Sequence, residues 1–318
     1  MKKTAKILKI LSAGIIILSL LSAVGVLFAS CTQSDGAVLE CNRHDVSADL
    51  HSIRIETLTS DIKLLPSDDA SCHVECLELS RVRHDVTVSG GELAIIADDR
   101  RTLIDQVTCP TETPHIYVYL PRSEYTALAV IDHTGKIDIE DEFKFESIDI
   151  TSSTGAVSLC GITAESVDIT AKTGAVKLDG AEIGRAKIEV TTGTVRVVSL
   201  TCRGELGITT TTGETMAEDV TCGSFRSEGS TGGITLRRVT AAGEMKITRK
   251  TGGVIFEGSD AAEIDVETTT GSVRGSLLSG KTFTATTKTG KIELPQSSSG
   301  NPCRISTTTG GINITVKD

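Results

Sequence analysis

The sequence is poor in aromatic residues. It contains no Trp, three Tyr and six Phe among its 318 residues. A hydrophobic core must therefore be built mainly from Ile, Val and Leu, which suit the pleated surface of a β-sheet. A hydrophobic content of 39% is ordinary for a folded protein and excludes a disordered chain.

Histidine is missing from more than half of the chain. All six precede Gly135, and they are His44, His51, His73, His84, His115 and His133. A Ser-His-Asp or Cys-His catalytic centre needs a histidine. Such a centre therefore cannot lie wholly within residues 135–318, and would have to lie in the first part of the chain or across its border.

A Thr-Gly pair recurs every 19 or 20 residues from Thr134 onward. Its ten glycines are Gly135, Gly155, Gly174, Gly193, Gly213, Gly232, Gly252, Gly271, Gly290 and Gly310. Apolar residues alternate on both sides of each pair, as in "VDITAKTGAVKL" from Val167 to Leu178. This alternation is typical of strands with one buried face.

The parity of the alternation predicts a bend at each Thr-Gly pair. Ile169 and Val176 are an odd number of residues apart, so an unbroken strand would turn one apolar set to solvent. A glycine with positive φ absorbs the slip without a Cβ penalty. Repeats of this length cannot bury a face alone, so we expect them to stack in parallel register as an all-β solenoid.

The segment Ser52–Leu64 fits the same template, with Thr59-Ser60 at the Thr-Gly place. Between Leu64 and Thr134 the pattern loosens, and "DVTVSGGELAII" fits either a hairpin through Gly90-Gly91 or a degenerate rung. We therefore expect an irregular β cap with the first rungs over residues 38–133, and a regular Thr-Gly solenoid over 134–318.

The N-terminus carries a membrane-directed segment. Four lysines lie within residues 1–9, and residues 10–28 contain no charge. This pattern predicts a cytoplasmic basic end (1–9), a transmembrane anchor or signal segment (10–29), a linker (30–37) and an exported C-terminal part. In "FASC", Cys31 follows small residues, so a lipoprotein anchored at Cys31 is the alternative to a single-pass membrane protein.

The exported part is acidic. Residues 38–318 hold 28 of the 32 basic residues and 41 of the 42 acidic ones, a balance of −13. Such a surface repels phosphate backbones, which argues against nucleic acid as a partner. Nine cysteines in an exported chain suggest disulfides, although a core of this size does not need them, and both possibilities stay open.

The stretch "YVYLPRSEYTALAVIDHTGKIDI", Tyr117 to Ile139, followed by serial Thr-Gly strands, resembles the bacterial putative-adhesin family. The resemblance covers nearly all of the exported part. It implies a β-solenoid-like domain behind a membrane segment or signal peptide, and it provides no catalytic residues.

Three residue sets are candidates for chemistry. Asp149 and Asp168 occupy equivalent places on adjacent rungs and could form a carboxylate pair of a glycan lyase or hydrolase. Cys72, His73 and Cys76 could be imagined as zinc ligands, but a strand would point His73 away from the two cysteines. Cys202 and Cys222 should stack on consecutive rungs, within possible disulfide range. We expect no catalytic residue, metal or cofactor.

The combined pattern favours a non-enzymatic, membrane-anchored cell-surface solenoid, an adhesin or an envelope scaffold, whose partner is an extracellular protein or glycan. One alternative is a polysaccharide lyase or hydrolase that uses rung carboxylates. Another is an envelope-stress sensor that acts through a membrane partner. The last rung, "TGGINITV", has no obvious cap, so we also expect weak self-association through the C-terminal rung.

Overall fold

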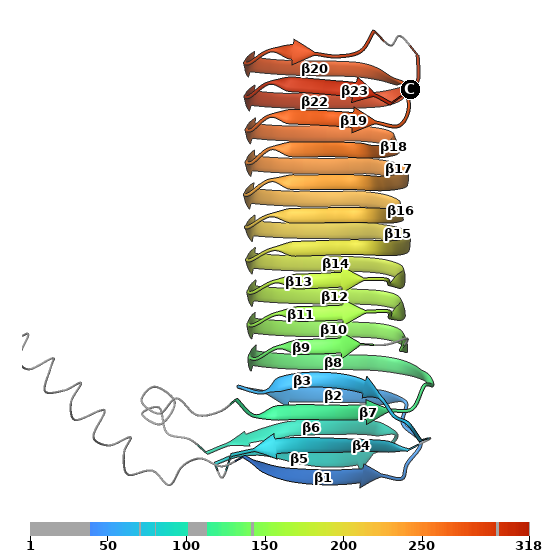
Figure 1. Cartoon of the computed structure of the whole chain (residues 1–318), viewed down its shortest axis with the longest axis vertical. Coiled ribbons are helices and arrows are strands. Elements are labelled where there is room, and N and C mark those ends of the chain that lie inside the picture. The colour runs from blue at the N-terminus through green and yellow to red at the C-terminus, as the bar shows by residue number, and fades with distance from the viewer. Residues whose placement is uncertain are drawn as a thin grey trace, which may run out of the picture.

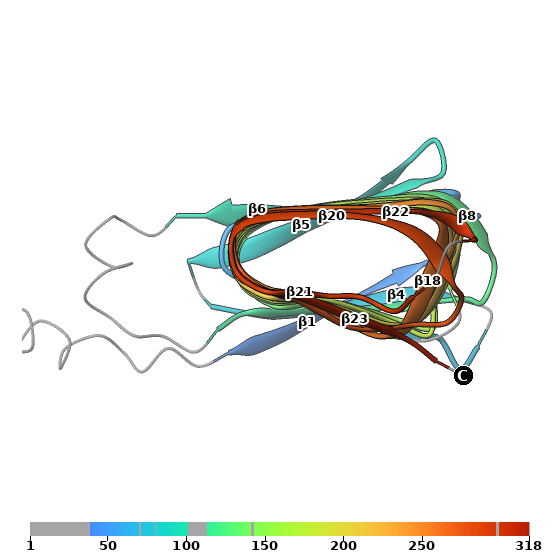
Figure 2. The same cartoon turned by 90° about the horizontal axis from the view of Figure 1, so that it is seen from above.

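The computed structural model describes residues 39–69, 71–79, 81–100, 113–140, 143–296 and 299–317. Across these ranges every regular element is a strand, and the strands form one elongated stack (Figure 1). Seen along its axis, the stack is a flattened ring of two facing sheets (Figure 2). The expected parallel β-solenoid is thereby confirmed.

The strands of the first part are β1 (Glu40–Val46), β2 (Ser52–Thr57), β3 (Asp61–Pro66), β4 (Cys72–Glu78), β5 (Val82–Ser89), β6 (Glu92–Asp99) and β7 (His115–Leu120). The ladder consists of β8 (Glu124–Thr134), β9 (Ile137–Glu140), β10 (Lys144–Thr154), β11 (Val157–Cys160), β12 (Thr163–Thr173), β13 (Val176–Asp179), β14 (Glu182–Thr192), β15 (Val195–Thr212), β16 (Thr215–Thr231), β17 (Ile234–Thr251), β18 (Val254–Thr270), β19 (Val273–Leu277), β20 (Lys281–Thr289), β21 (Ile292–Glu293), β22 (Asn301–Thr309) and β23 (Ile312–Val316).

Each rung of the ladder contributes one segment to each sheet. The segments before the Thr-Gly pairs, such as β8, β10, β12 and β14, form what we call the β8 face. The segments after the pairs, such as β9, β11 and β13, form the β9 face. Equivalent residues stack in register, for example Ile148 on Val167, and the inward Ile, Val and Leu side chains form one continuous core.

Backbone contact between rungs accounts for the glycines of the Thr-Gly pairs. At nine of the ten, from Gly155 to Gly310, φ lies between +124° and +159°. A Cβ atom on Gly193 would lie 1.7 Å from the carbonyl oxygen of Gly174 on the next rung. The amide of each of these two glycines also donates to a threonine carbonyl of the neighbouring rung. The glycine therefore permits both the bend and the close stacking of corners.

A second corner, six residues after each Thr-Gly glycine from Gly155 to Gly252, was not foreseen from the sequence. Gly161, Gly180 and Gly258 have positive φ there, and so do the non-glycine residues Ser199, Asp219 and Arg238, with φ of 51° to 54°. These residues take the left-handed conformation at equivalent places of successive rungs, where glycine is the unstrained residue.

β-Bulges account for two of the 20-residue steps of the repeat, those that end at Gly213 and Gly252. Ile183 pairs with Cys202 and Ala186 pairs with Leu206, so β15 contains one residue more than β14 between these positions. A similar shift between Ala241 and Glu244 accompanies the longer β17. The extra residue is absorbed locally, and the core register continues beyond it.

The first part of the chain continues the stack less regularly. β2 and β3 form a rung that pairs in parallel with β8 and β9, as expected for Ser52–Leu64. The segment through Gly90-Gly91 is an antiparallel hairpin of β5 and β6, and β6 also pairs in parallel with β2. β1 pairs with β4, and β4 with β7, both antiparallel. We call β1, β4, β5, β6 and β7 the cap.

The C-terminal end corrects one prediction. The last rung of the sequence, β22 and β23, lies inside the stack: β22 pairs with both β18 and β20, and β23 with both β19 and β21. The preceding rung, β20 and β21, forms the end instead (Figure 1). After β19 the chain first forms the end rung, β20 and β21, and then returns to form β22 and β23 between that rung and the rung of β18 and β19. The open edge of the stack therefore lies at residues 281–293.

The predicted membrane segment (10–29), the linker (30–37) and Cys31 lie outside the described residues. Within the described ranges, no helix has the length and apolar character needed to cross a membrane.

Candidate functional site

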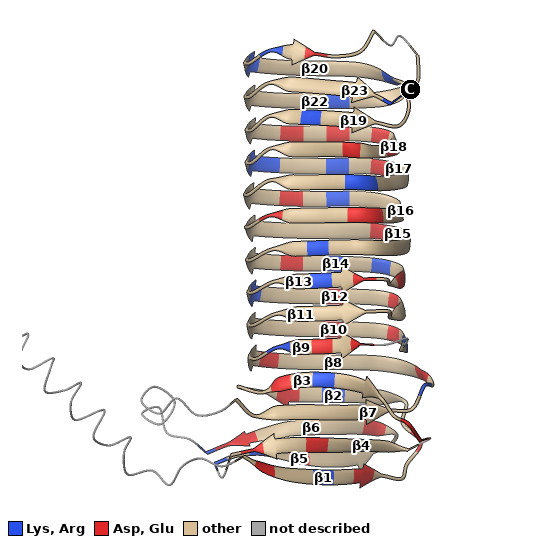
Figure 3. Cartoon of the chain, viewed as in Figure 1, with Lys and Arg blue, Asp and Glu red and all other residues tan. Residues whose placement is uncertain are grey.

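The outer surface of the ladder is a set of vertical columns, because equivalent residues stack in register. On the β8 face one column runs through Asp149, Asp168, Lys187, Gly207 and Arg226. Other parts of the ladder also carry both acidic and basic residues, interspersed over the rungs (Figure 3). The charge in the column changes from negative at Asp168 to positive at Lys187, and Gly207 has no side chain there.

A shallow groove lies on the β8 face where this column loses its side chain. Its floor is formed by Gly184, Gly204 and Gly207, and charged side chains from β12, β14, β15 and β16 line it. Gly184 and Gly204 belong to the bulged stretch, where a Cβ on Gly184 would lie 2.4 Å from the carbonyl oxygen of Glu165. Gly207 has room for a side chain, so its lack of one deepens the groove.

Most basic side chains at the groove are neutralised by carboxylates. Arg203 contacts Glu165 at 2.6 Å, Lys187 contacts Glu189 at 2.7 Å, and Arg226 contacts Glu228 at 2.5 Å. Arg185 is exposed and has no ion pair with another described residue. The groove therefore presents one free guanidinium among paired charges, an arrangement suited to an anionic or hydrogen-bonding group of a ligand.

A second groove follows the Thr-Gly corner on the β9 face. Gly233 and Gly253 leave its floor bare, and Met216 and Ile255 give it an apolar part between Arg196 and Arg274. It spans neighbouring rungs from Thr194 to Ser272. Both grooves are thus produced by glycines on the outer faces of successive rungs.

Asp149 and Asp168 are neighbours, as expected, in direct register on β10 and β12. Asp149 is exposed and Asp168 is partly exposed. Lys187 is the register partner of Asp168 on the next rung, and the negative charge of Asp168 acts on its ammonium group. The pair is an outward-facing part of a charged column, and the register partner of Asp149 on the preceding strand β8 is Ala129.

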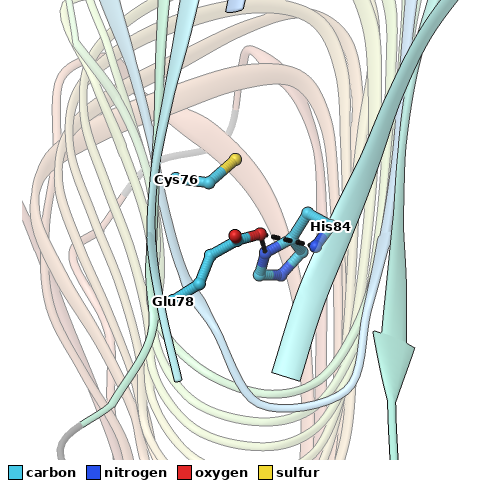
Figure 4. Close-up of side chains that lie close together, drawn as sticks. All are labelled: Cys76, Glu78 and His84. Carbon is cyan, nitrogen blue, oxygen red and sulfur yellow. Dashed lines mark hydrogen bonds and ion pairs between the residues drawn. The ribbon is translucent and has the colours of Figure 1, made fainter. Parts of the chain in front are cut away.

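The cap holds a buried polar cluster (Figure 4). Glu78 at the end of β4 and His84 in β5 are 2% and 5% exposed. Glu78 Oε1 accepts hydrogen bonds from the His84 backbone N–H at 2.5 Å and from His84 Nδ1 at 2.9 Å. Burial lowers the pKa of His84, against the raising effect of Glu78, so the ring is neutral and Nδ1 carries the proton.

The remaining atoms of the cluster are also bonded. Glu78 Oε2 accepts from Asn42 Nδ2 at 2.5 Å and from Arg83 at 3.3 Å. His84 Nε2 lies 3.0 Å from Ser60 Oγ, which accepts from Thr57 Oγ1 at 3.0 Å. Ser60, His84 and Glu78 thus follow the order of a hydrolase relay. Ser60 is completely buried, so in this conformation its hydroxyl has no path to a substrate.

The zinc ligand set considered from the sequence is not assembled. Cys72 and Cys76 point into the core and His73 points outward, where it stacks on Tyr119 at 4.8 Å between ring centroids. Cys76 instead lies beside Glu78 and His84. The alternation of β4 places Glu78 on the face of Cys76, but nothing in the sequence indicates that β5 brings His84 opposite.

The described cysteines are all free thiols. Cys202 and Cys222 are register partners on β15 and β16, as expected, but are not linked. Burial raises the pKa of Cys72, Cys76, Cys222 and Cys303 to about 12, so without a bound metal these thiols are protonated.

The chain belongs to the Toastrack DUF4097 family, which matches residues 50–225 and 205–318. Similar solved structures have low sequence identity to this chain. A putative lipid binding protein from Parabacteroides distasonis is 13% identical with a TM-score of 0.51, covering 88% of this chain and 99% of its own. A putative adhesin from Bacteroides fragilis is 13% identical with a TM-score of 0.45, covering 87% and 97%. None of the curated proteins matches the sequence.

Proposed function

We propose that the protein is a non-enzymatic, surface-displayed solenoid that binds an extracellular protein or glycan along its β8 face. The observation that carries this proposal is the charged groove over Gly184, Gly204 and Gly207 with the unpaired Arg185. The groove is built on strands held in register on both sides, so it is preorganised and binding costs little ordering entropy.

The proposed ligand carries anionic groups spaced along an extended chain. Grooves that cross several rungs suit a polymer or a flat protein surface better than a small enclosed molecule. The carboxylates beside Arg203, Lys187 and Arg226 make the groove selective, because a densely anionic polymer would be repelled by them.

Display at the cell surface is part of the proposal. It rests on the uncharged segment 10–28 behind four lysines, with lipidation of Cys31 as the alternative anchor. Protease treatment of intact cells should remove the domain, and complete protection would contradict surface display. Incorporation of a labelled fatty acid distinguishes the two anchors, because only a lipoprotein would carry the label and it would lose the label in Cys31→Ala.

The binding test uses the full-length chain in mild detergent on an array of glycans, matrix proteins and lipid vesicles. We expect saturable binding to a glycan or protein that falls at least about tenfold in Lys187→Glu. Lys246→Glu, in the same column but outside the groove, is the matched control and should bind normally. Equal losses in both variants would indicate only a general charge effect.

The same array tests the enzyme alternative, which is supported by the stacking of Asp149 on Asp168. Mass spectrometry of the glycans after incubation would detect cleavage. Products that disappear in Asp149→Asn or Asp168→Asn, with folding retained, would show that the protein is a lyase or hydrolase. This outcome would overturn the binding proposal. Binding to vesicles alone would overturn the protein or glycan partner.

A further inference from the structure

The cap contains a second candidate site that is independent of the proposed binding groove. Cys76, Glu78 and His84 each offer one ligand atom, and these atoms all lie within 4.8 Å of one another. All three residues are buried, and the side chains of Cys76 and Glu78 come from the same face of β4 while His84 faces them from β5 (Figure 4).

The donor set matches one class of metal ion. A thiolate, an imidazole and a carboxylate are the ligands of tetrahedral zinc sites, whereas calcium and magnesium require oxygen donors only. We propose that Cys76 Sγ, His84 Nδ1 and Glu78 form a zinc site in the cap. A fourth position would be filled by water.

The surroundings of the three residues suit this assignment. Ser60 Oγ holds the other ring nitrogen of His84 at 3.0 Å and so fixes the orientation of the imidazole. Asn42 and Arg83 hold Glu78 Oε2 and fix the carboxylate. Ligand residues that are held by such partners are preorganised, which is what distinguishes a site from a chance cluster.

Metal binding has a defined proton balance. The Cys76 thiol loses its proton, which leaves to solvent. The proton on His84 Nδ1 is replaced by one on Nε2, which then donates to Ser60 Oγ, so the imidazole stays neutral. Binding of one zinc ion therefore releases one proton from the protein, and the two ligand anions balance the charge of the ion.

The sequence offers a matched control. Cys72 lies on the same strand and the same buried face as Cys76, but it is not part of the cluster. Loss of either thiol removes one buried sulfur from the cap core, so both changes should cost similar packing energy. Only Cys76→Ser removes a ligand.

The experiment uses the full-length chain, stripped of metal by a chelator and titrated with Zn²⁺ and, as a coloured substitute, with Co²⁺. We expect one equivalent of zinc per chain, a thiolate-to-cobalt charge-transfer band, and a higher thermal midpoint with zinc. Cys72→Ser should keep all three. Cys76→Ser should lose the band and bind zinc at least about 100-fold more weakly.

Two outcomes would overturn the proposal. One is the absence of stoichiometric zinc and of the cobalt band in the wild-type chain, which would leave the cluster as a hydrogen-bonded structural element. The other is a band that survives in Cys76→Ser, which would place the metal elsewhere. If Cys76→Ser does not fold, His84→Gln and the wild-type cobalt spectrum decide between these readings.

Discussion

The ladder and the cap differ in how their buried side chains are arranged. In the ladder every interior position is repeated, so the residue stacked on Ser152 is Ala171, followed by Val190. That column begins with buried Asp132 on β8, and the ladder also buries Arg249 and Lys281, which are 2% and 1% exposed. These three residues lie on separate rungs. In the cap the repeat fails, and there a buried thiol, carboxylate and imidazole lie together, at Cys76, Glu78 and His84.

The largest expected effect breaks a corner of the ladder. Gly193→Ala places a methyl group on the Gly174 carbonyl oxygen, at a φ of +154°, where no side chain can move away to make room. We expect a loss of about 4 kcal/mol or more in the free energy of unfolding. Thermal and denaturant unfolding of the full-length chain would measure it.

The control for this substitution lies in the same rung. Gly207→Ala adds the same methyl group, but its nearest neighbours outside the adjacent residues lie 3.4 Å or more away. We expect a change of less than about 1 kcal/mol. If Gly207→Ala cost as much as Gly193→Ala, the loss would not be specific to the stacked corners, and corner stacking would not explain the Thr-Gly repeat.

The next effect is the pH dependence of stability that arises from a carboxyl buried on β8, the first strand of the ladder. Asp132 is 1% exposed, and neither carboxylate oxygen has a hydrogen-bond partner. Desolvation raises its pKa to about 7, and the nearby backbone N–H groups of Thr134 and His133, which do not reach hydrogen-bond geometry, lower it only in part. Because the folded pKa is above the unfolded one, this stability is fully present below about pH 4 and is lost as the pH rises through 7.

The measurement is the unfolding free energy of Asp132→Asn compared with the wild type from pH 4 to 8. We expect the wild type to lose up to about 4 kcal/mol relative to the variant over this range. Asp149→Asn, which removes one exposed carboxylate from the neighbouring strand β10, is the control for the loss of a negative charge. Parallel curves for wild type and Asp132→Asn would contradict an unpaired buried carboxyl.

Most of the fold could be predicted from the sequence, because the spacing of a repeat indicates which residues pair between neighbouring rungs. The Thr-Gly spacing fixes which residues stack, and the parity of Ile169 and Val176 requires a bend between them. The insertion of β22 and β23 beneath β20 and β21 could not be predicted, since both rungs have the same pattern and either could pair with β18. The order of equivalent rungs depends on loop geometry, which the pattern does not contain.

The candidate sites were less accessible to sequence reasoning. The change of sign from Asp168 to Lys187 and the gap at Gly207 are visible once the repeat is aligned, but the bulge that opens the groove is not. The cap cluster joins His84 to Glu78 by the turn between β4 and β5, and there no repeat guides the pairing. The second corner had a signal, because Gly161 and Gly180 each follow a Thr-Gly glycine by six residues.

A smaller effect tests that second corner. Ser199→Gly relieves a left-handed conformation at φ 51° on an exposed residue, and we expect a gain of about 0.5–1 kcal/mol. The reciprocal change, Gly180→Ser, should lose about 1 kcal/mol, because its Cβ meets no atom closer than 3.9 Å and only the conformation is penalised. A loss in both variants would show that the corner requires local hydrogen bonds and not conformational freedom.

The smallest effect concerns the open end of the ladder. Among the described strands β20 pairs only with β22, and Phe283 and Ala285 are partly exposed beside an uncovered core. We expect weak self-association of the full-length chain at high micromolar concentration, seen by sedimentation. Thr284→Lys should abolish it, because a charge on an edge strand opposes pairing, whereas Thr170→Lys in the middle of the same face should not. A monomer at every concentration would contradict pairing through the open edge of β20.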